Sequence, residues 1–272
     1  MQELTVTKLS KLTIVIKGAG EMASAIAWRL YMANFKRILM LETTTPLAVR
    51  RKVPFCEALH DGSHTVEGVK AIMAGAIGDV PSAWEQGWIA VAADPQWLLP
   101  KKIRPNVVVD AILAKKNLGT RMMDAELVIG LGPGFYAGND VHMVIETNRG
   151  HDLGRIITTG SAETNTGVPG AIAGYTEERV LRAPDAGLFE TTRSIGDLVK
   201  AGEIIGTVTQ QEIFSRIDGV IRGLIRSETT VTRGLKIGDV DPRGQKQHCY
   251  SISEKARAIG GSVLEAVLRV FN

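Results

Sequence analysis

Ile14-Val15-Ile16-Lys17-Gly18-Ala19-Gly20-Glu21-Met22-Ala23 is the stretch that decides the expected fold. The apolar run predicts a buried strand, and the apolar spacing over residues 26–33 predicts a helix directly after the glycines. Gly18 permits a tight turn, Gly20 lets the backbone approach an anion closely, and the small Ala23 lets the helix pack on the strand. Because the free N–H groups at a helix N-terminus attract negative charge, this pattern is typical of a phosphate-binding turn.

A second apolar run, residues 38–41, ends on Glu42. A dinucleotide-binding fold places its ribose-binding acid at this point, about twenty residues after the glycines. Lys17, Arg50 and the basic residues 51–52 add positive charge, which suits a 2′-phosphate or another phosphorylated ligand. A purely structural turn and a solvated basic helix face explain the same residues, so both interpretations stay open.

The composition restricts the class of protein. The chain has 272 residues, a formal net charge of +3, 5% aromatic residues and two widely separated cysteines, Cys56 and Cys249. This near-balanced charge indicates no nucleic-acid partner, and the cysteines suggest reduced thiols in the cytoplasm. We see no signal peptide at the N-terminus and no apolar run of the ~20 residues that a membrane span needs, so we expect a cytoplasmic protein that binds no membrane.

Further short apolar runs follow in the first half of the chain, at residues 88–93, 107–111, 127–131 and 141–146. Such runs, buried on both faces, suit a mainly parallel sheet. We also expect a short helix over residues 46–60, a strand over 65–74, and a loop over 95–105 because of its three prolines. The fold class predicted for residues 1–175 is therefore α/β, a Rossmann-like domain with a mainly parallel sheet that binds a nucleotide.

The second half contains an internal repeat with a constant offset of 32 residues. The glycines at 187, 202 and 206 recur at 219, 234 and 238, and valines 199 and 208 recur at 231 and 240. Each unit reads as strand, turn and strand, which predicts an all-β barrel-sandwich hybrid over residues 176–245 like that of lipoyl and biotinyl carrier domains. Those domains carry their cofactor on a lysine between the repeats, and residues 209–216 contain none, so we expect no swinging-arm role.

Residues 246–272 are expected to add a strand and a helix. Ser253 is the predicted N-cap of that helix. The glycine pair at 260–261 interrupts its apolar stripe, which indicates either the close approach of another backbone or a ligand, or an ordinary kink.

Polar residues follow two of the expected strands and form a candidate crevice. Asp110 ends the run 107–110, with Lys115 and Asn117 shortly after it. Gly132 and Gly134 follow the next run. Because open α/β sheets bind ligands at the carboxyl ends of their strands, we expect these residues to converge on a ligand, with Asp110 and Lys115 as catalytic candidates. An aspartate that caps a helix, solvated lysines and tight glycine turns are the structural alternatives.

The polar, glycine-rich stretch 146–174 supplies the third candidate loop. Arg149 and Arg155 are expected to bind a phosphate there, and His151 is a candidate acid or base beside Asp152. A histidine that merely lies on a polar surface is the alternative. His60 and His64 have an i, i+4 spacing, but Gly62 between them favours a loop, so we predict no metal site.

Taken together, several long stretches resemble a known family. They are residues 18–20, 47–53, 109–120, 129–135, 146–155 and 236–244, and the resemblance runs from about Leu12 to Leu268. The chain is similar to the YqeB-type family of selenium-dependent molybdenum hydroxylase system proteins. The resemblance implies an accessory role in maturing molybdenum hydroxylases that carry labile selenium, and a first domain similar to those of xanthine dehydrogenase maturation factors.

Two functions are therefore expected from the sequence, and whether the chain catalyses a step stays open. The first is a maturation factor that binds a nucleotide, a selenium donor or a molybdenum cofactor intermediate. Its expected partners are a molybdenum hydroxylase and the other maturation proteins of that enzyme, and a homo-oligomer is one possible state of the chain. The second is an NAD(P)-dependent oxidoreductase with Asp110, Lys115 or His151 as proton donor. No Tyr-x-x-x-Lys pair stands out in support of the second.

Overall fold

The computed structural model describes residues 9–165, 167 and 170–272. The chain divides into two units, each of which is described separately. Unit 1 comprises Met1–Pro46, Pro54–Asn165 and Ile252–Asn272, and unit 2 comprises Leu47–Val53 and Thr166–Ser251. Both units are thus discontinuous in sequence, whereas the sequence predicted boundaries after residues 175 and 245.

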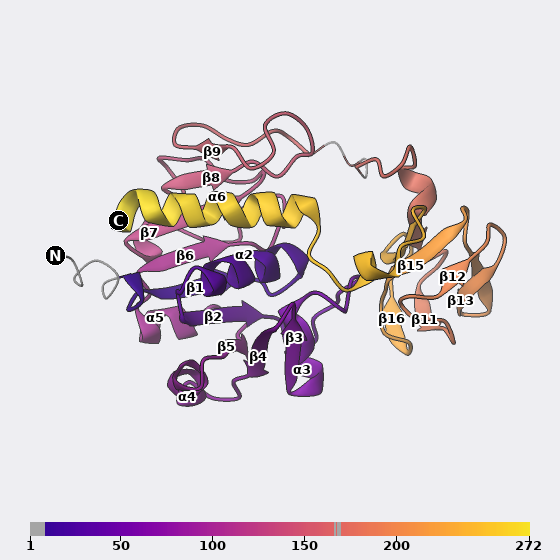
Figure 1. Ribbon diagram of the computed structural model, residues 1–272, viewed down its shortest axis with the longest axis horizontal. Coiled ribbons are helices and arrows are strands. Elements are labelled where there is room, and N and C mark those ends of the chain that lie inside the picture. The colour runs from indigo at the N-terminus through magenta and orange to yellow at the C-terminus, as the bar shows by residue number, and fades with distance from the viewer. Residues whose placement is uncertain (1–8, 166, 168–169) are drawn as a thin grey trace. The chain divides into compact units, whose positions relative to one another are not determined.

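Unit 1 is built on one nine-stranded sheet in the order β3-β4-β5-β2-β1-β6-β7-β8-β9 (Figure 1). The strands are β1 (Thr13–Lys17), β2 (Arg37–Glu42), β3 (Ser63–Val66), β4 (Val69–Met73), β5 (Ile89–Ala93), β6 (Val107–Asp110), β7 (Leu127–Leu131), β8 (Met143–Ile145) and β9 (Ile156–Ile157). The seven strands from β4 to β8 in this order are parallel. At the two edges, β3 and β9 run antiparallel to their neighbours, so the sheet is mixed.

Helices cover both faces of this sheet. They are α2 (Glu21–Met32), α3 (Ala58–Asp61), α4 (Asp79–Glu85), α5 (Leu99–Ile103) and α6 (Glu254–Phe271). Val15, Leu39 and Val108 pack with residues of α4 and α5 on one face. Because side chains alternate along a strand, Ile14 and Ile16 point to the opposite face, where α2 and α6 lie side by side (Figure 1).

The glycine pair in α6 is explained by this helix pairing. A Cβ at Gly260 would lie 3.1 Å from the carbonyl oxygen of Ala25 and 3.3 Å from Cβ of Arg29, both on α2. The helices approach closely only because this position lacks a side chain, whereas a Cβ at Gly261 would meet open space. Ser253 is the N-cap, as predicted, and its hydroxyl accepts a hydrogen bond from the Ala256 amide.

Unit 2 consists of two separate four-stranded antiparallel sheets. One has the order β10-β17-β15-β12 and the other β14-β13-β11-β16. The strands are β10 (Val180–Arg182), β11 (Gly187–Glu190), β12 (Leu198–Val199), β13 (Ile204–Val208), β14 (Gln211–Phe214), β15 (Gly219–Leu224), β16 (Thr229–Val231) and β17 (Lys236–Asp241). Strands one repeat apart, such as β11 and β15, occupy equivalent central places in the two sheets, and buried side chains such as Phe189 and Ile221 form a common core.

The predicted fold class, a Rossmann-like mainly parallel sheet plus a barrel-sandwich hybrid, is wrong. Unit 1 is a mixed α/β sheet with two antiparallel edges, and unit 2 is two separate antiparallel sheets. A regular doubly wound sheet has an α-helix between successive strands. The segments 111–126 and 132–142, which the structure describes throughout, instead contain turns and the short 3-10 helix η2 (Met122–Asp124). Glycine and proline in these segments disfavour the helical crossovers of a regular doubly wound sheet.

Several local expectations also need correction. The strand expected over residues 65–74 is part of a hairpin, β3 and β4, whose turn contains Glu67 and Gly68, both at positive φ. The helix expected over 46–60 is reduced to a 3-10 turn, η1 (Phe55–Glu57), and the four residues of α3. Conversely, α5 forms within the expected loop, because Pro100 stands in its first turn, where proline has no hydrogen bond to lose. Residues 246–249 form a 3-10 helix in place of the expected strand.

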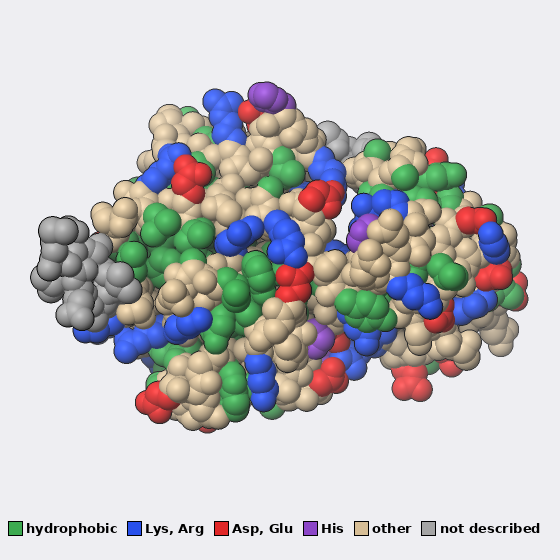
Figure 2. Space-filling model, viewed as in Figure 1, with side chains coloured by type: hydrophobic (Ala, Val, Ile, Leu, Met, Phe, Trp, Pro, Cys, Tyr) green, Lys and Arg blue, Asp and Glu red, His purple; other side chains and the backbone are tan. Residues whose placement is uncertain are grey.

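The surface view shows one face of the molecule, on which blue and red side chains are interspersed over α2 and α6 (Figure 2). No helix among the described residues combines the length and apolar character that crossing a bilayer requires.

Candidate functional site

The candidate site begins where two neighbouring parallel strands end. Lys17 ends β1, Asp110 ends β6, and the two residues are register partners. Both lie on the face that carries α4 and α5, because they follow Val15 and Val108 by two residues. Lys17 is only 5% exposed and Asp110 only 2%. The fold therefore places a buried cation beside a buried carboxyl group at the edge where open α/β sheets hold ligands.

The hydroxyl of Thr120 joins these two groups. Nζ of Lys17 donates to Oγ1 of Thr120 at 2.8 Å, and Oγ1 donates to Oδ2 of Asp110 at 2.6 Å. Asn117 positions Thr120, because its Oδ1 accepts from the Thr120 amide and its Nδ2 donates to the Thr120 carbonyl, both at 2.8 Å. Nζ of Lys17 also donates to Oδ2 of Asp124 at 3.3 Å.

Burial raises the pKa of Asp110 above its ordinary value, because desolvation disfavours the charged carboxylate. The hydrogen bonds from Thr120 and from the Ile112 amide and the charge of Lys17 oppose this shift. Asp110 is thus a carboxyl group whose proton is held more tightly than usual, in contact with a network that reaches Lys17.

The glycine turn lies directly beside this network. Gly18 has φ +96°, and a Cβ there would lie 3.1 Å from the carbonyl oxygen of Ala111, so the turn requires glycine. A Cβ at Gly20, the N-cap of α2, would meet open space. Ala23 is fully buried. Oε1 of Glu42 accepts a hydrogen bond from the Ala19 amide at 3.2 Å, so the predicted ribose acid does border the turn.

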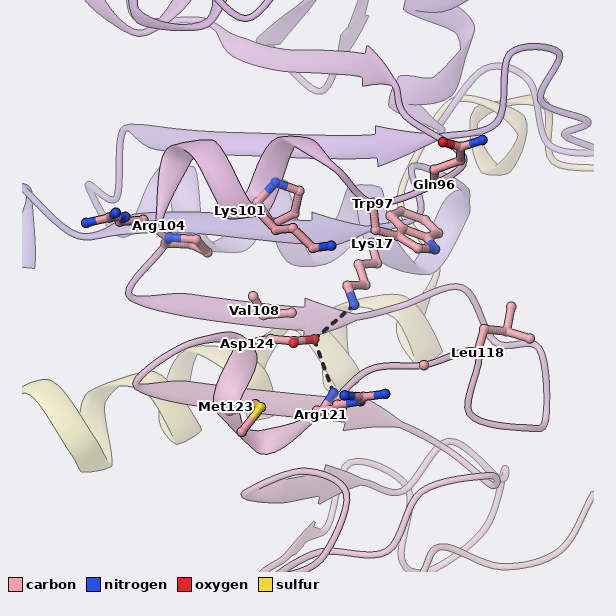
Figure 3. A pocket seen from close by; sticks show the side chains of 13 residues that line it. Lys17, Gln96, Trp97, Lys101, Arg104, Val108, Leu118, Arg121, Met123 and Asp124 are labelled. Atoms are coloured by element: carbon pink, nitrogen blue, oxygen red, sulfur yellow. Dashed lines mark hydrogen bonds and ion pairs between the residues drawn. The ribbon is translucent and has the colours of Figure 1, made fainter.

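A cavity of about 700 Å³ opens beside Lys17 and runs along β6 (Figure 3). One wall comes from residues 96–105 around α5, and the other comes from residues 118–124 around η2. Among the described residues, its lining includes four cationic side chains and one carboxylate: Lys17, Lys101, Arg104, Arg121 and Asp124. The volume falls within the range of small-molecule sites, and the excess of positive charge favours an anionic ligand.

The turn after β7 packs against the loop that follows Asp110. A Cβ at Gly134 would lie 2.6 Å from the backbone of Lys116, and one at Gly132 would overlap the Thr147 side chain. The Asp110 loop and the glycine turn therefore meet. Lys115 itself is exposed, with φ +61°.

The third candidate loop pairs its charges locally. Arg149 forms an ion pair with Glu254 at the start of α6, and the exposed Arg155 pairs with Asp152. His151 is exposed in a turn. The buried carboxylate of Glu146 accepts hydrogen bonds from the amides of Thr147, Asn148 and Glu163, which organises the loop. None of Arg149, His151 and Arg155 lines the cavity beside Lys17.

Arg50 belongs to unit 2, whereas the other residues of the predicted crevice belong to unit 1. It is 6% exposed and donates to the carbonyl oxygens of His248 and Ser251. These bonds tie the segment 47–53 into unit 2. Among the residues that the structure describes, no cluster of three or more histidine, cysteine or acidic side chains could hold a metal ion.

The cavity also contains residues that the sequence interpretation missed. Trp97, Lys101, Arg104 and Arg121 line it, but they come from two segments without a recognisable motif. The one sequence signal was the group of basic residues between the prolines at 100 and 105, together with Arg121 shortly after Gly119.

Comparison with known proteins gives one close relative. The chain is 49% identical over 259 residues to the "Uncharacterized protein YqeB" of Escherichia coli (strain K12). The chain resembles YqeB. The aligned part covers 95% of this chain and 48% of YqeB, so the chain spans about half the length of this curated relative. This similarity supports the resemblance to YqeB inferred from the sequence. No family model matches the chain.

Solved structures are similar only at low levels. A succinylglutamate desuccinylase/aspartoacylase from Rhodobacter sphaeroides is 29% identical and has a TM-score of 0.23, with 32% of this chain and 30% of that chain covered. TcdA (CsdL) is 11% identical, with a TM-score of 0.33 and coverage of 98% and 91%. At these TM-scores the similarities assign neither a fold nor an activity to this chain.

Proposed function

We propose that this chain is an accessory factor for the maturation of selenium-dependent molybdenum hydroxylases, and that it binds a nucleotide or a phosphorylated cofactor intermediate in unit 1. The sequence similarity to YqeB supports the YqeB-type family. The link to selenium and molybdenum is part of what we propose. The observation that carries the ligand-binding part is the cavity beside Lys17, whose described lining includes four cationic side chains and one carboxylate.

The roles of the residues follow from their positions. Lys17 supplies a buried positive charge at the carboxyl end of β1, and Thr120 and Asp110 hold its ammonium group in place. Lys101, Arg104 and Arg121 are exposed and attract an anion from solvent. Asp110, whose pKa is raised by burial, does not line the cavity and acts through the hydroxyl of Thr120.

Unit 2 supplies the docking surface for the hydroxylase in this proposal. Leu188, Ile204 and Phe214 are each about 44–45% exposed on the sheet β14-β13-β11-β16, and Ile204 and Phe214 are register partners. Ile204 and Phe214 lie opposite each other on neighbouring strands, and this pair of exposed apolar side chains offers an apolar contact to a protein partner.

The test uses a strain of the source organism in which the gene for this protein is deleted. A plasmid encoding the double variant Arg104→Ala/Arg121→Ala is compared with one encoding Arg37→Ala/Lys102→Ala, which changes exposed cations outside the cavity lining. We expect the first to leave the selenium content and activity of the purified hydroxylase at the level of the deletion strain, and the second to restore both. Full restoration by the cavity variant contradicts the proposal.

An NAD(P)-dependent oxidoreductase is the second candidate, and one observation favours it. Glu42 borders the Gly18–Gly20 turn through the Ala19 amide, as a ribose-binding acid would. Titration of the full chain with NADH and NADPH tests this candidate. Binding that is weakened by Glu42→Ala supports it, and the absence of binding at millimolar cofactor contradicts it.

A further inference from the structure

The cavity beside Lys17 presents an aromatic side chain together with its positive charges. Trp97 is half-buried, and its ring centroid lies 5.7 Å from Nζ of Lys17. Figure 3 shows Lys17 reaching from β1 into the cavity near Trp97, toward Asp124. A ligand of modest size can therefore contact the indole and the ammonium group at the same time.

The backbone holds Trp97 firmly in this place. Its φ is +55°, a left-handed conformation that bulky residues rarely adopt. The buried carboxylate of Asp94 accepts hydrogen bonds from the amides of Leu98 at 3.0 Å and Leu99 at 2.7 Å, and the Trp97 amide donates to the Asp94 carbonyl. The turn thus places the backbone of Trp97 at the cavity wall, from which its indole lines the cavity.

Asp124 occupies the position next to Lys17 that a ligand anion would take. Its Oδ2 accepts from Nζ of Lys17 at 3.3 Å and from the Arg121 amide at 3.1 Å. The Asp124 side chain is 29% exposed and lies on the short 3-10 helix η2, at the rim of the cavity. Because this carboxylate already collects a cationic and an amide donor, the same donors can receive a phosphate oxygen.

We infer that the cavity binds a phosphorylated heteroaromatic compound whose ring packs against Trp97 and whose phosphate approaches Lys17, where it competes with Asp124. The inference rests on the proposed function, since it specifies the ligand class of the same cavity. A nucleoside monophosphate is the simplest compound of this class. The ring supplies apolar contact with the indole, and the phosphate neutralises the excess of positive charge.

Isothermal titration of the full chain with four probes tests both halves of the ligand. The probes are adenosine 5′-monophosphate, adenosine, ribose 5-phosphate and inorganic phosphate. We expect adenosine 5′-monophosphate to bind at least about tenfold more tightly than each of the other three. Ribose 5-phosphate and inorganic phosphate lack the ring that stacks on the indole, and adenosine lacks the phosphate that the cationic side chains attract. Equal affinity for adenosine 5′-monophosphate and inorganic phosphate overturns the ring contact.

Substitutions of Trp97 locate the ring. Trp97→Phe keeps an aromatic face and is expected to bind adenosine 5′-monophosphate within about threefold of the wild type, whereas Trp97→Leu loses about tenfold. The affinity for ribose 5-phosphate should be the same in both variants. If Trp97→Leu binds adenosine 5′-monophosphate as tightly as Trp97→Phe does, the inference is wrong.

Two neighbouring lysines on α5 provide a matched pair for the charge. Lys101 lines the cavity, while Lys102 is exposed outside the lining. Lys101→Met should weaken the binding of adenosine 5′-monophosphate severalfold and lower its salt dependence, and Lys102→Met should leave both unchanged. Equal effects of the two substitutions contradict binding of the phosphorylated compound in this cavity.

Asp124→Asn tests the competition, because it removes a negative charge while keeping the shape of the side chain. We expect phosphate-containing probes to bind severalfold more tightly to this variant and adenosine to bind unchanged. Weaker phosphate binding overturns the inference. The two proposals can fail separately. If none of the probes binds as expected but maturation of the hydroxylase still requires Arg104 and Arg121, the inferred ligand class is wrong and the proposed function stands. If adenosine 5′-monophosphate binds as expected but maturation does not require Arg104 and Arg121, the proposed function is wrong and the inferred ligand class stands.

Discussion

Lys17 and Asp110 are opposite partners on neighbouring parallel strands, and the hydroxyl of Thr120 connects their side chains. The hydroxyl accepts from the ammonium group and donates to the carboxyl oxygen. A buried charge without a hydrogen-bond partner is unstable, so this bridge allows both groups to remain under the protein surface. It also joins the strand ends to the wall of the cavity.

Thr120→Val should destabilise unit 1, because it keeps the shape of the side chain but removes the bridging hydroxyl. We expect the free energy of unfolding to fall by about 1–3 kcal/mol, the usual effect of leaving a buried polar group unpaired. Urea denaturation followed by circular dichroism measures this change. Thr120→Ser retains the hydroxyl and serves as the control; equal stability of the valine and serine variants would show that the bridge is unimportant.

Gly134→Ala should disturb the junction between the turn after β7 and the loop after Asp110. The new Cβ would lie 2.6 Å from backbone atoms of Lys116, which cannot move aside cheaply. Gly119 has a similar positive φ, +103° against +109°, but a Cβ there meets open space. Gly119→Ala therefore serves as the control, because it introduces the backbone strain without the clash. We expect Gly134→Ala to melt at a lower temperature than Gly119→Ala, which corresponds to a further loss of about 1–3 kcal/mol in the free energy of unfolding. Identical melting temperatures would refute the predicted clash.

Lys255→Met should change how stability depends on pH. Desolvation lowers the pKa of Lys255 below 10.5, and the charge of Arg149 lowers it further, against Glu21 and Glu146. Between the lowered pKa and 10.5 the unfolded chain binds more protons than the folded one, so this group makes stability rise with pH in that window. The variant should lack this rise. Denaturation curves of the wild type and the variant from neutral to alkaline pH measure it, and parallel pH profiles would contradict the prediction.

Asp239→Asn should destabilise unit 2 strongly. The fully buried Asp239 carboxylate pairs with Arg179 and Arg222, whose side chains are also almost buried. Desolvation alone would raise the pKa of Asp239, but the charges of Lys236, Arg222 and Arg179 outweigh it and lower that pKa. Loss of the charge leaves buried cations poorly compensated, and we expect about 3–5 kcal/mol of lost stability.

The control for this prediction is Asp218→Asn, which breaks an exposed ion pair with Lys200. Exposed pairs contribute little because water screens them, so the denaturation midpoint should not move. Guanidinium denaturation of the two variants gives the comparison. If both variants unfold at the same denaturant concentration, the buried network has no special role.

The sequence by itself determined the local features. The apolar runs located β1, β2, β5, β6 and β7, the glycines located the turn before α2, Ser253 began α6, and the 32-residue offset related β11 to β15. Each of these depends on residues close in sequence, where periodicity and backbone freedom act directly.

Only the tertiary structure decided which distant segments meet. Lys17 and Thr120 are 103 residues apart, α6 packs on α2 from the other end of unit 1, and the short segment Leu47–Val53 joins unit 2. The antiparallel edges of the unit 1 sheet and the two separate sheets of unit 2 were likewise decided at this level. A hydrophobic pattern records that a residue is buried but not which partner buries it, because that choice depends on the packing of the whole chain.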